Sequence, residues 1–133
     1  MTLATGLRRG YQREVMLQIK IRYHSLESVF YQNFFLADEI DEIIFLNTFR
    51  KIERKVRNRI RINLNEVIWY YCGYIISELT SRHENIVIQN NLSNLVRKDM
   101  VMIGVSEFME KIEIDIQRDN SKSYNFLVEN PLS

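Results

Sequence analysis

A stripe of apolar residues at helical spacing runs through the middle of the chain and constrains the fold most strongly. Successive members are four, three, four and four residues apart, which places them on one face of an α-helix. Asp38 is a candidate N-cap, acidic residues follow it, and basic residues gather at the far end, as the helix dipole favours. The stripe consists of Phe45, Phe49, Ile52, Val56 and Ile60. A long amphipathic helix is therefore expected from Asp38 onward.

Further helices are expected after this one. Residues 66–79 are apolar on nearly all sides, which indicates a helix enclosed by other elements, and Asn65 is its candidate N-cap. Shorter helices are predicted over residues 89–96 and from Asp99 to about Phe108.

Alternating apolar residues predict strands near both ends of the chain. Residues 15–23 alternate at a period of two, although the sequence identifies no pairing partner. The segments 112–117 and 124–128 alternate on either side of a turn-forming run and predict a β-hairpin. A hairpin alone is marginal in water, so it must pack on the helices or on another chain. The expected fold class is α+β and mainly helical: a small helical bundle followed by a C-terminal hairpin.

Composition narrows the class of protein. The 133 residues are 46% hydrophobic and 26% charged, which favours one globular domain. The net charge of +1 argues against a strongly electrostatic binder of nucleic acid or membranes. The lone Cys72 cannot form an internal disulfide, which fits a reducing cytoplasm. No apolar run reaches the ~18 residues of a transmembrane helix.

The residues that usually carry chemistry are sparse. His24 and His83 lack the spacing of a metal site, and Cys72 lies in the most apolar predicted helix, where a thiol is a poor nucleophile. Glycine-rich phosphate loops and common hydrolase motifs are missing from the sequence. No catalytic or metal-binding residue is therefore predicted.

A basic cluster is the feature most open to a binding role. Residues 50–61 carry seven basic side chains and one acidic side chain, so they could follow a phosphate backbone or form a solvated face. Four acidic residues just before the cluster and the near-neutral whole chain weigh against nucleic acid. The aromatic residues of 66–79 suit either a core or a subunit contact.

Four short motifs follow one another along the chain in the order found in a known family. With these motifs, residues 36–133 resemble the small gamma subunit of bacterial and archaeal-type ureases. The motifs are Asp41-Glu42-Ile43-Ile44, Glu53-Arg54-Lys55 with Arg59 to Glu66, Asp99 to Phe108, and Ile112-Glu113-Ile114 with Glu129-Asn130-Pro131-Leu132. Residues 1–35 have no counterpart in that family and are expected to be an extension of unknown role, so residues 36–133 form the predicted domain.

The resemblance implies a non-catalytic structural subunit of a nickel-dependent urease, which hydrolyses urea to ammonia and carbamate. Nickel and the catalytic groups would lie in the alpha subunit, and this chain would bind no cofactor. Its implied partners are the urease beta and alpha subunits in a trimer of heterotrimers, without nucleic acid or membrane. The predicted interface residues are Trp69, Tyr70, Tyr74, Phe126, Asn130, Pro131 and Leu132. The alternative is a nucleic-acid-associated or protein-interaction module that uses the 50–61 helix face.

Overall fold

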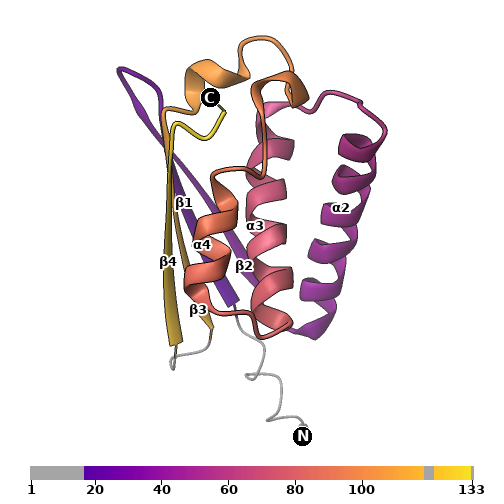
Figure 1. Ribbon diagram of the computed structural model, residues 1–133. Helices are drawn as coiled ribbons and strands as arrows, with labels where there is room; N and C mark the ends of the chain where they lie inside the picture. The colour runs from indigo at the N-terminus through magenta and orange to yellow at the C-terminus, as the bar shows by residue number, and fades with distance from the viewer. Residues whose placement is uncertain (1–16, 119–121, 133) are drawn as a thin grey trace, which may run out of the picture.

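The protein consists of one antiparallel sheet with helices on one of its faces (Figure 1). The computed structural model describes residues 17–118 and 122–132. The four strands lie in the order β2-β1-β3-β4. They are β1 (Leu17–His24), β2 (Val29–Leu36), β3 (Lys111–Arg118) and β4 (Lys122–Glu129). The first and last parts of the described chain therefore meet in the middle of one sheet, where β1 pairs with β3.

Each strand alternates between a covered and an open face. Ile19 lies opposite Phe34 on β2 and Ile116 on β3, and these side chains point toward the helices. The other face carries charged and polar residues on β1 and β3 and exposed aromatic residues on β2, so that Arg22 lies opposite Tyr31 on one side and Glu113 on the other. Branched apolar residues favour such a half-buried pleated surface.

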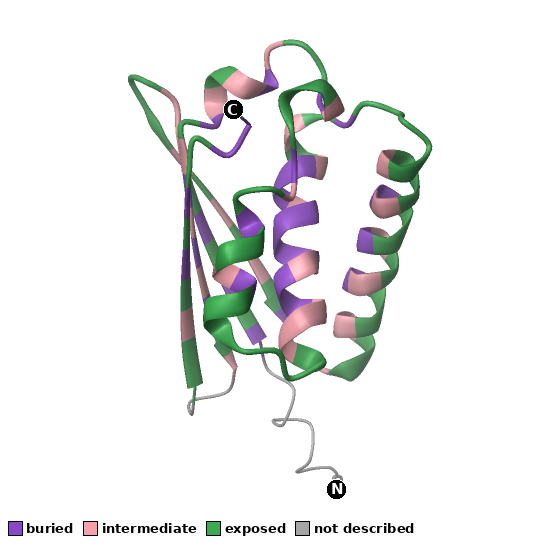
Figure 2. Cartoon of the chain, viewed as in Figure 1, coloured by how far each residue is buried: buried purple, intermediate pink, exposed green. Residues whose placement is uncertain are grey.

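The two long helices on the sheet are buried to different extents. Helix α3 (Leu64–Thr80) is the more deeply buried, while α2 (Glu39–Arg57) buries only the stripe that faces α3 and exposes its outer side (Figure 2). Asp38 caps α2 as predicted, since its Oδ1 accepts a 2.9 Å hydrogen bond from the Asp41 N–H. The N-cap predicted at Asn65 is wrong, because Asn63 caps α3 in a reciprocal capping box with Glu66.

An aromatic cluster joins β2, α2 and α3. The rings of Phe45 and Trp69 stack with centroids 4.9 Å apart, and Phe34 meets both rings edge-on. Further along the two helices, an added Cβ on Gly73 would lie 2.4 Å from the Phe49 ring. Only glycine therefore fits where Phe49 crosses α3.

Shorter elements complete the fold. Helix α4 (Asn85–Leu92) packs beside α3 and β4, and the 3-10 helices η2 (Lys98–Met100) and η3 (Val105–Phe108) lie at one end of the molecule (Figure 1). Ile62 and Val101 form a parallel bridge that ties the α2–α3 connection to the segment after η2. The C-terminal residues fold back over α3, where the buried Tyr71 hydroxyl donates a 3.4 Å hydrogen bond to the Pro131 carbonyl.

The predicted fold class, α+β and mainly helical, is wrong, because the protein is not mainly helical. Of the described residues, 45% are helical and 30% are in strands, with a four-stranded sheet in place of a helical bundle that carries one hairpin. The prediction failed because β2 was not recognised, and without β2 the strand over 15–23 had no evident place in a sheet. The expected boundary at residue 35 falls at the end of β2, inside this sheet. Residues 1–16 lie outside the described part of the chain.

The other predicted elements fared better. The helix expected from Asp38 onward, the helix over 66–79, the strand over 15–23 from Leu17 onward and the hairpin are confirmed within a few residues. Ile60, the last member of the predicted stripe, is an exception, because α2 ends at Arg57 and Ile60 is exposed. Residues 15 and 16 lie outside the described part of the chain. The helix predicted over 89–96 begins earlier, as α4, and the one predicted from Asp99 to Phe108 is divided into η2 and η3. Gly104 separates η2 from η3 with a left-handed φ of 94°.

Candidate partner-binding site

The charges of α2 are sorted along its length. Its first turn is acidic and its last turn is basic, which matches the partial charges of the helix ends. One of the basic residues is tied down, since Lys55 Nζ lies 2.5 Å from Glu66 Oε2 at the start of α3. Partial burial by itself raises the pKa of Glu66, but the hydrogen bonds from Lys55 and the Asn63 N–H, with the Lys55 charge, lower it overall. This contact fixes the turn between the two helices.

Arg59 holds an unusual backbone conformation in that turn. Its φ is 61°, in the left-handed region, and it follows the C-cap Asn58. The Arg59 N–H donates to the Val56 carbonyl at 3.1 Å, and the Ile60 N–H donates to the Lys55 carbonyl at 2.9 Å. This is the Schellman arrangement, whose left-handed position is usually glycine. An arginine is therefore held where a side chain is conformationally costly.

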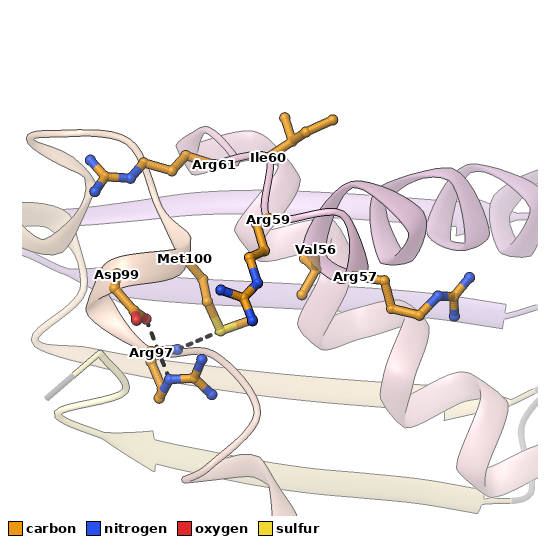
Figure 3. A pocket seen from close by; sticks show the side chains of 8 residues that line it. All are labelled: Val56, Arg57, Arg59, Ile60, Arg61, Arg97, Asp99 and Met100. Carbon is orange, nitrogen blue, oxygen red and sulfur yellow. Dashed lines mark hydrogen bonds and ion pairs between the residues drawn. The ribbon is translucent and has the colours of Figure 1, made fainter.

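The Arg59 side chain opens onto a surface hollow of about 370 Å³. In Figure 3 the guanidinium groups of Arg59 and Arg97 point toward the same space beside Met100, while Arg57 and Arg61 point outward on opposite sides. The residues that line the hollow are Val56, Arg57, Arg59, Ile60, Arg61, Arg97, Asp99 and Met100. Four arginines but only one acidic residue therefore line the hollow.

The acidic groups nearby neutralise little of this charge. Arg97 Nε lies 3.3 Å from Asp99 Oδ1, and both side chains are about two-thirds exposed (67% and 68%). Arg57 reaches Glu53 only at 3.9 Å. Exposed pairs of this kind contribute roughly 0–1 kcal/mol, so an incoming carboxylate can replace them. Within residues 17–118 and 122–132, Arg59 makes no ion pair.

Apolar side chains stand beside the arginines. Ile60 and Met102 are about half exposed, and Ile103 is 96% exposed. A second hollow of about 510 Å³ adjoins the first, sharing Arg61 and Asp99 with it and bringing in Met102 and Ile103. We call residues 56–61 and 97–103 together the arginine end. This surface combines guanidinium groups with exposed apolar groups, a composition typical of protein interfaces.

Two backbone hydrogen bonds hold the two halves of the arginine end together. The Ile62 N–H donates to the Met100 carbonyl at 3.1 Å, and the Met102 N–H donates to the Ile62 carbonyl at 2.9 Å. Ile62 and Val101 are buried beneath them. The basic cluster predicted over 50–61 contains Arg57, Arg59 and Arg61, although the last two lie beyond the end of α2 and not on a helix face. Arg97 and Met100 were not predicted, because nothing local in the sequence places them beside Arg59.

The predicted interface residues lie mostly inside the chain. Phe126, Leu132 and Tyr70 are 3%, 4% and 8% exposed, and Pro131 is also buried. Burial raises the pKa of Tyr70. Their role at an interface stays a prediction, and a partner that reached them would have to displace packing within this chain.

The other three predicted interface residues reach the surface to different degrees. Trp69 donates its indole N–H to the Phe45 carbonyl at 3.2 Å, and the Tyr74 hydroxyl accepts from Asn91 at 3.1 Å. Asn130 is exposed, with a left-handed φ of 50°. None of the three belongs to the arginine end.

The histidines and the cysteine form no site together. His24 and Arg22 both contact Glu113 on the open face of the sheet, and His83 lies 2.7 Å from Glu78. Burial raises the pKa of the Cys72 thiol well above its usual range. In the described part of the chain, His, Cys, Asp and Glu residues form no group of three or more that could hold a metal ion. The expectation that this chain binds no cofactor stays a prediction.

The comparisons with known proteins place the chain in no family. No protein-family model matches it, and no curated protein matches it. Among the described residues, no helix combines the length and apolar character needed to cross a membrane.

Proposed function

We propose that this chain is a non-catalytic subunit of a larger assembly, and that the arginine end binds an acidic, partly apolar surface of a partner protein. The observation that carries the proposal is the position of Arg59, held in a left-handed conformation beside Arg97 without an acidic partner among the described residues. Strain at an exposed position favours a binding role over a stabilising one. Guanidinium groups bind carboxylates in a bidentate manner.

The exposed Ile60, Met102 and Ile103 favour a protein over nucleic acid as the partner. Aromatic side chains on which bases could stack do not line either hollow. A protein surface that carries both carboxylates and apolar side chains complements both components of the arginine end.

The urease beta and alpha chains are the partners that we propose to test first. Two motifs of the urease gamma resemblance, residues 59–66 and 99–108, are joined by the Ile62–Val101 bridge and supply much of the arginine end. In this proposal urea hydrolysis and nickel belong to the alpha chain, and the assembly lies in the cytoplasm, where the lone buried Cys72 stays reduced.

The proposal is tested by co-expressing this chain, carrying an affinity tag, with urease beta and alpha chains. We expect all three chains to purify together with nickel and to release ammonia from urea. The double variant Arg59→Gly, Arg97→Gln should retain at least tenfold less of the larger chains, because it removes the two guanidinium groups that point into the hollow.

Arg82→Gly is the matched control. Arg82 also has a left-handed φ, of 64°, at the corresponding position after α3, but it does not line the arginine end. It should leave the yield of complex unchanged. Equal yields from the double variant would contradict the assignment of the site. A chain that ignores the urease chains and binds duplex DNA with strong salt dependence would overturn the proposal in favour of a nucleic-acid-associated module.

A further inference from the structure

Strand β2 forms an edge of the sheet with an unusual composition. Its eight residues, Val29 to Leu36, include four aromatic side chains and no charged residue or proline. Natural proteins normally protect such edges with charges, prolines, bulges or a covering element, because an uncharged edge pairs readily with another strand. In the described part of the chain, no strand other than β1 pairs with β2.

The opposite edge of the sheet is protected. The side-chain amide of Gln89 on α4 accepts a 3.1 Å hydrogen bond from the Leu127 N–H and donates one of 2.5 Å to the Leu127 carbonyl. This side chain bonds to β4 at Leu127 as a neighbouring strand would. Among the described residues, no side chain makes such a contact with the backbone of β2.

The strand register identifies the groups that β2 leaves open. Leu127 directs its backbone N–H and C=O away from β3, so Leu127 and Glu113 form a non-hydrogen-bonded pair. Glu113 and Arg22 then form a hydrogen-bonded pair, and Arg22 and Tyr31 again form a non-hydrogen-bonded pair. Tyr31, Asn33 and Phe35 therefore point their N–H and C=O groups outward, and the even-numbered residues bond to β1. The same three side chains lie on the open face, where Tyr31 is 71% exposed and Phe35 is 55% exposed.

We infer that β2 pairs with β2 of a second copy of this chain, in antiparallel orientation about a twofold axis perpendicular to the sheet. Such an axis keeps the open faces together and sets odd-numbered residues opposite odd-numbered residues, so the outward backbone groups of the two copies satisfy one another. With Asn33 on the axis, Tyr31 of each copy lies opposite Phe35 of the other. The result is a continuous sheet of twice the width with all helices on one face.

The charges of β2 and α2 favour a second copy of this chain as the partner of the β2 edge. The two β2 strands bring no charged residues into register, so no like charges meet. Helix α2, which packs on β2 through Phe45 and Phe34, is reversed by the twofold axis. The acidic first turn of one α2 would then run toward the basic last turn of the other. The exposed Ile40 and Ile44 of α2 supply apolar surface on the same helix.

The inference is tested on the full chain by light scattering and sedimentation over a range of concentrations. We expect a dimer whose dissociation constant rises at least tenfold in Asn33→Lys and in Asn33→Asp, since each variant sets like charges together at the axis. Mixing the two variants should restore the dimer, because lysine then meets aspartate. A mixture that stays monomeric would contradict the register.

Asn125→Lys is the matched control, because Asn125 lies in the same row of the open face on the protected edge. It should leave the dimer intact. Hydrogen exchange gives a second measurement: the amides of Tyr31, Asn33 and Phe35 should gain protection with concentration, while those of Gln32 and Phe34 are protected at all concentrations. A wild-type chain that stays monomeric would overturn the inference. If the chain dimerised only after removal of residues 1–16, that segment and not a second copy would be the partner of the β2 edge in the full chain. The dimer does not depend on the arginine end, so Arg59→Gly should leave it unchanged.

Discussion

At the scale of single residues, two arginines adopt the same unfavourable left-handed backbone conformation. Arg59 and Arg82 both follow a helix C-cap with left-handed φ values, of 61° and 64°. Glycine adopts this conformation without the steric cost that a Cβ imposes. Both positions are therefore expected to tolerate glycine well, whether or not their side chains have a binding role.

We expect Arg59→Gly and Arg82→Gly each to raise the free energy of unfolding by about 1 kcal/mol, measured by urea denaturation. The comparison separates conformation from function, because only the change at position 59 should weaken partner binding. A loss of stability in Arg59→Gly would mean that its side chain makes stabilising contacts that outweigh the backbone strain.

The Lys55–Glu66 contact predicts a pH dependence. The folded-state pKa of Glu66 is lowered from its ordinary value of 4.5, so its contribution to stability is complete above that value and is lost as the pH falls through the lowered pKa. Between about pH 7 and pH 3, wild type should lose more unfolding free energy than Glu66→Gln. Lys55→Met should show an intermediate profile, because Glu66 keeps the hydrogen bond from the Asn63 N–H. Parallel profiles for the three proteins would exclude this contact as a source of acid sensitivity.

At the scale of elements, the packing of α2 on α3 depends on Gly73. An alanine there places a methyl group 2.4 Å from Phe49 Cδ1. We expect Gly73→Ala to cost about 1–3 kcal/mol of unfolding free energy, despite the better helix propensity of alanine. Adding Phe49→Leu should recover part of the loss, and a double-mutant cycle measures that coupling. Additive effects of the two substitutions would argue against direct contact.

The cap on β4 makes a separate prediction. Gln89→Ala should accelerate amide hydrogen exchange at Leu127, because that N–H loses its acceptor. Gln89→Glu keeps an acceptor for the N–H but loses the donor to the Leu127 carbonyl, so Leu127 should stay protected. Exchange rates measured by NMR decide between these outcomes. Identical rates in the alanine variant and wild type would show that the contact is absent in solution.

The elements also show where sequence reasoning succeeds. The stripe of α2 and the alternation of β1, β3 and β4 were recognisable because each buries one face, and burial imposes a period. Strand β2 lacks that period, since Tyr31 and Phe35 are apolar on the open face and Gln32 lies on the covered face. The basic half of the site at 56–61 was likewise visible locally, whereas the approach of Arg97 to Arg59 depends on tertiary structure.

At the scale of the whole molecule, β1 is one of the two central strands of the sheet. It pairs along its full length with both β2 and β3, and Leu17, Ile19 and Ile21 are buried. We expect a chain that lacks residues 1–36 to lose its cooperative unfolding transition, observed by circular dichroism against temperature. Exposed Ile103→Ala serves as the control for a neutral change. A cooperative transition in the shortened chain would show that residues 37–133 fold alone.

The aromatic cluster between the layers also gives the molecule its own optical reporter. Trp69 is the sole tryptophan of the chain, and it stacks on Phe45 of α2 while touching Phe34 of β2. Its fluorescence must therefore change when either element moves away from α3. The single thiol of Cys72 lies on α3 itself and is fully buried, so labelling reagents reach it only after deeper opening. Fluorescence and thiol labelling together can time the separation of α2 and β2 against the opening of the core, without an added dye.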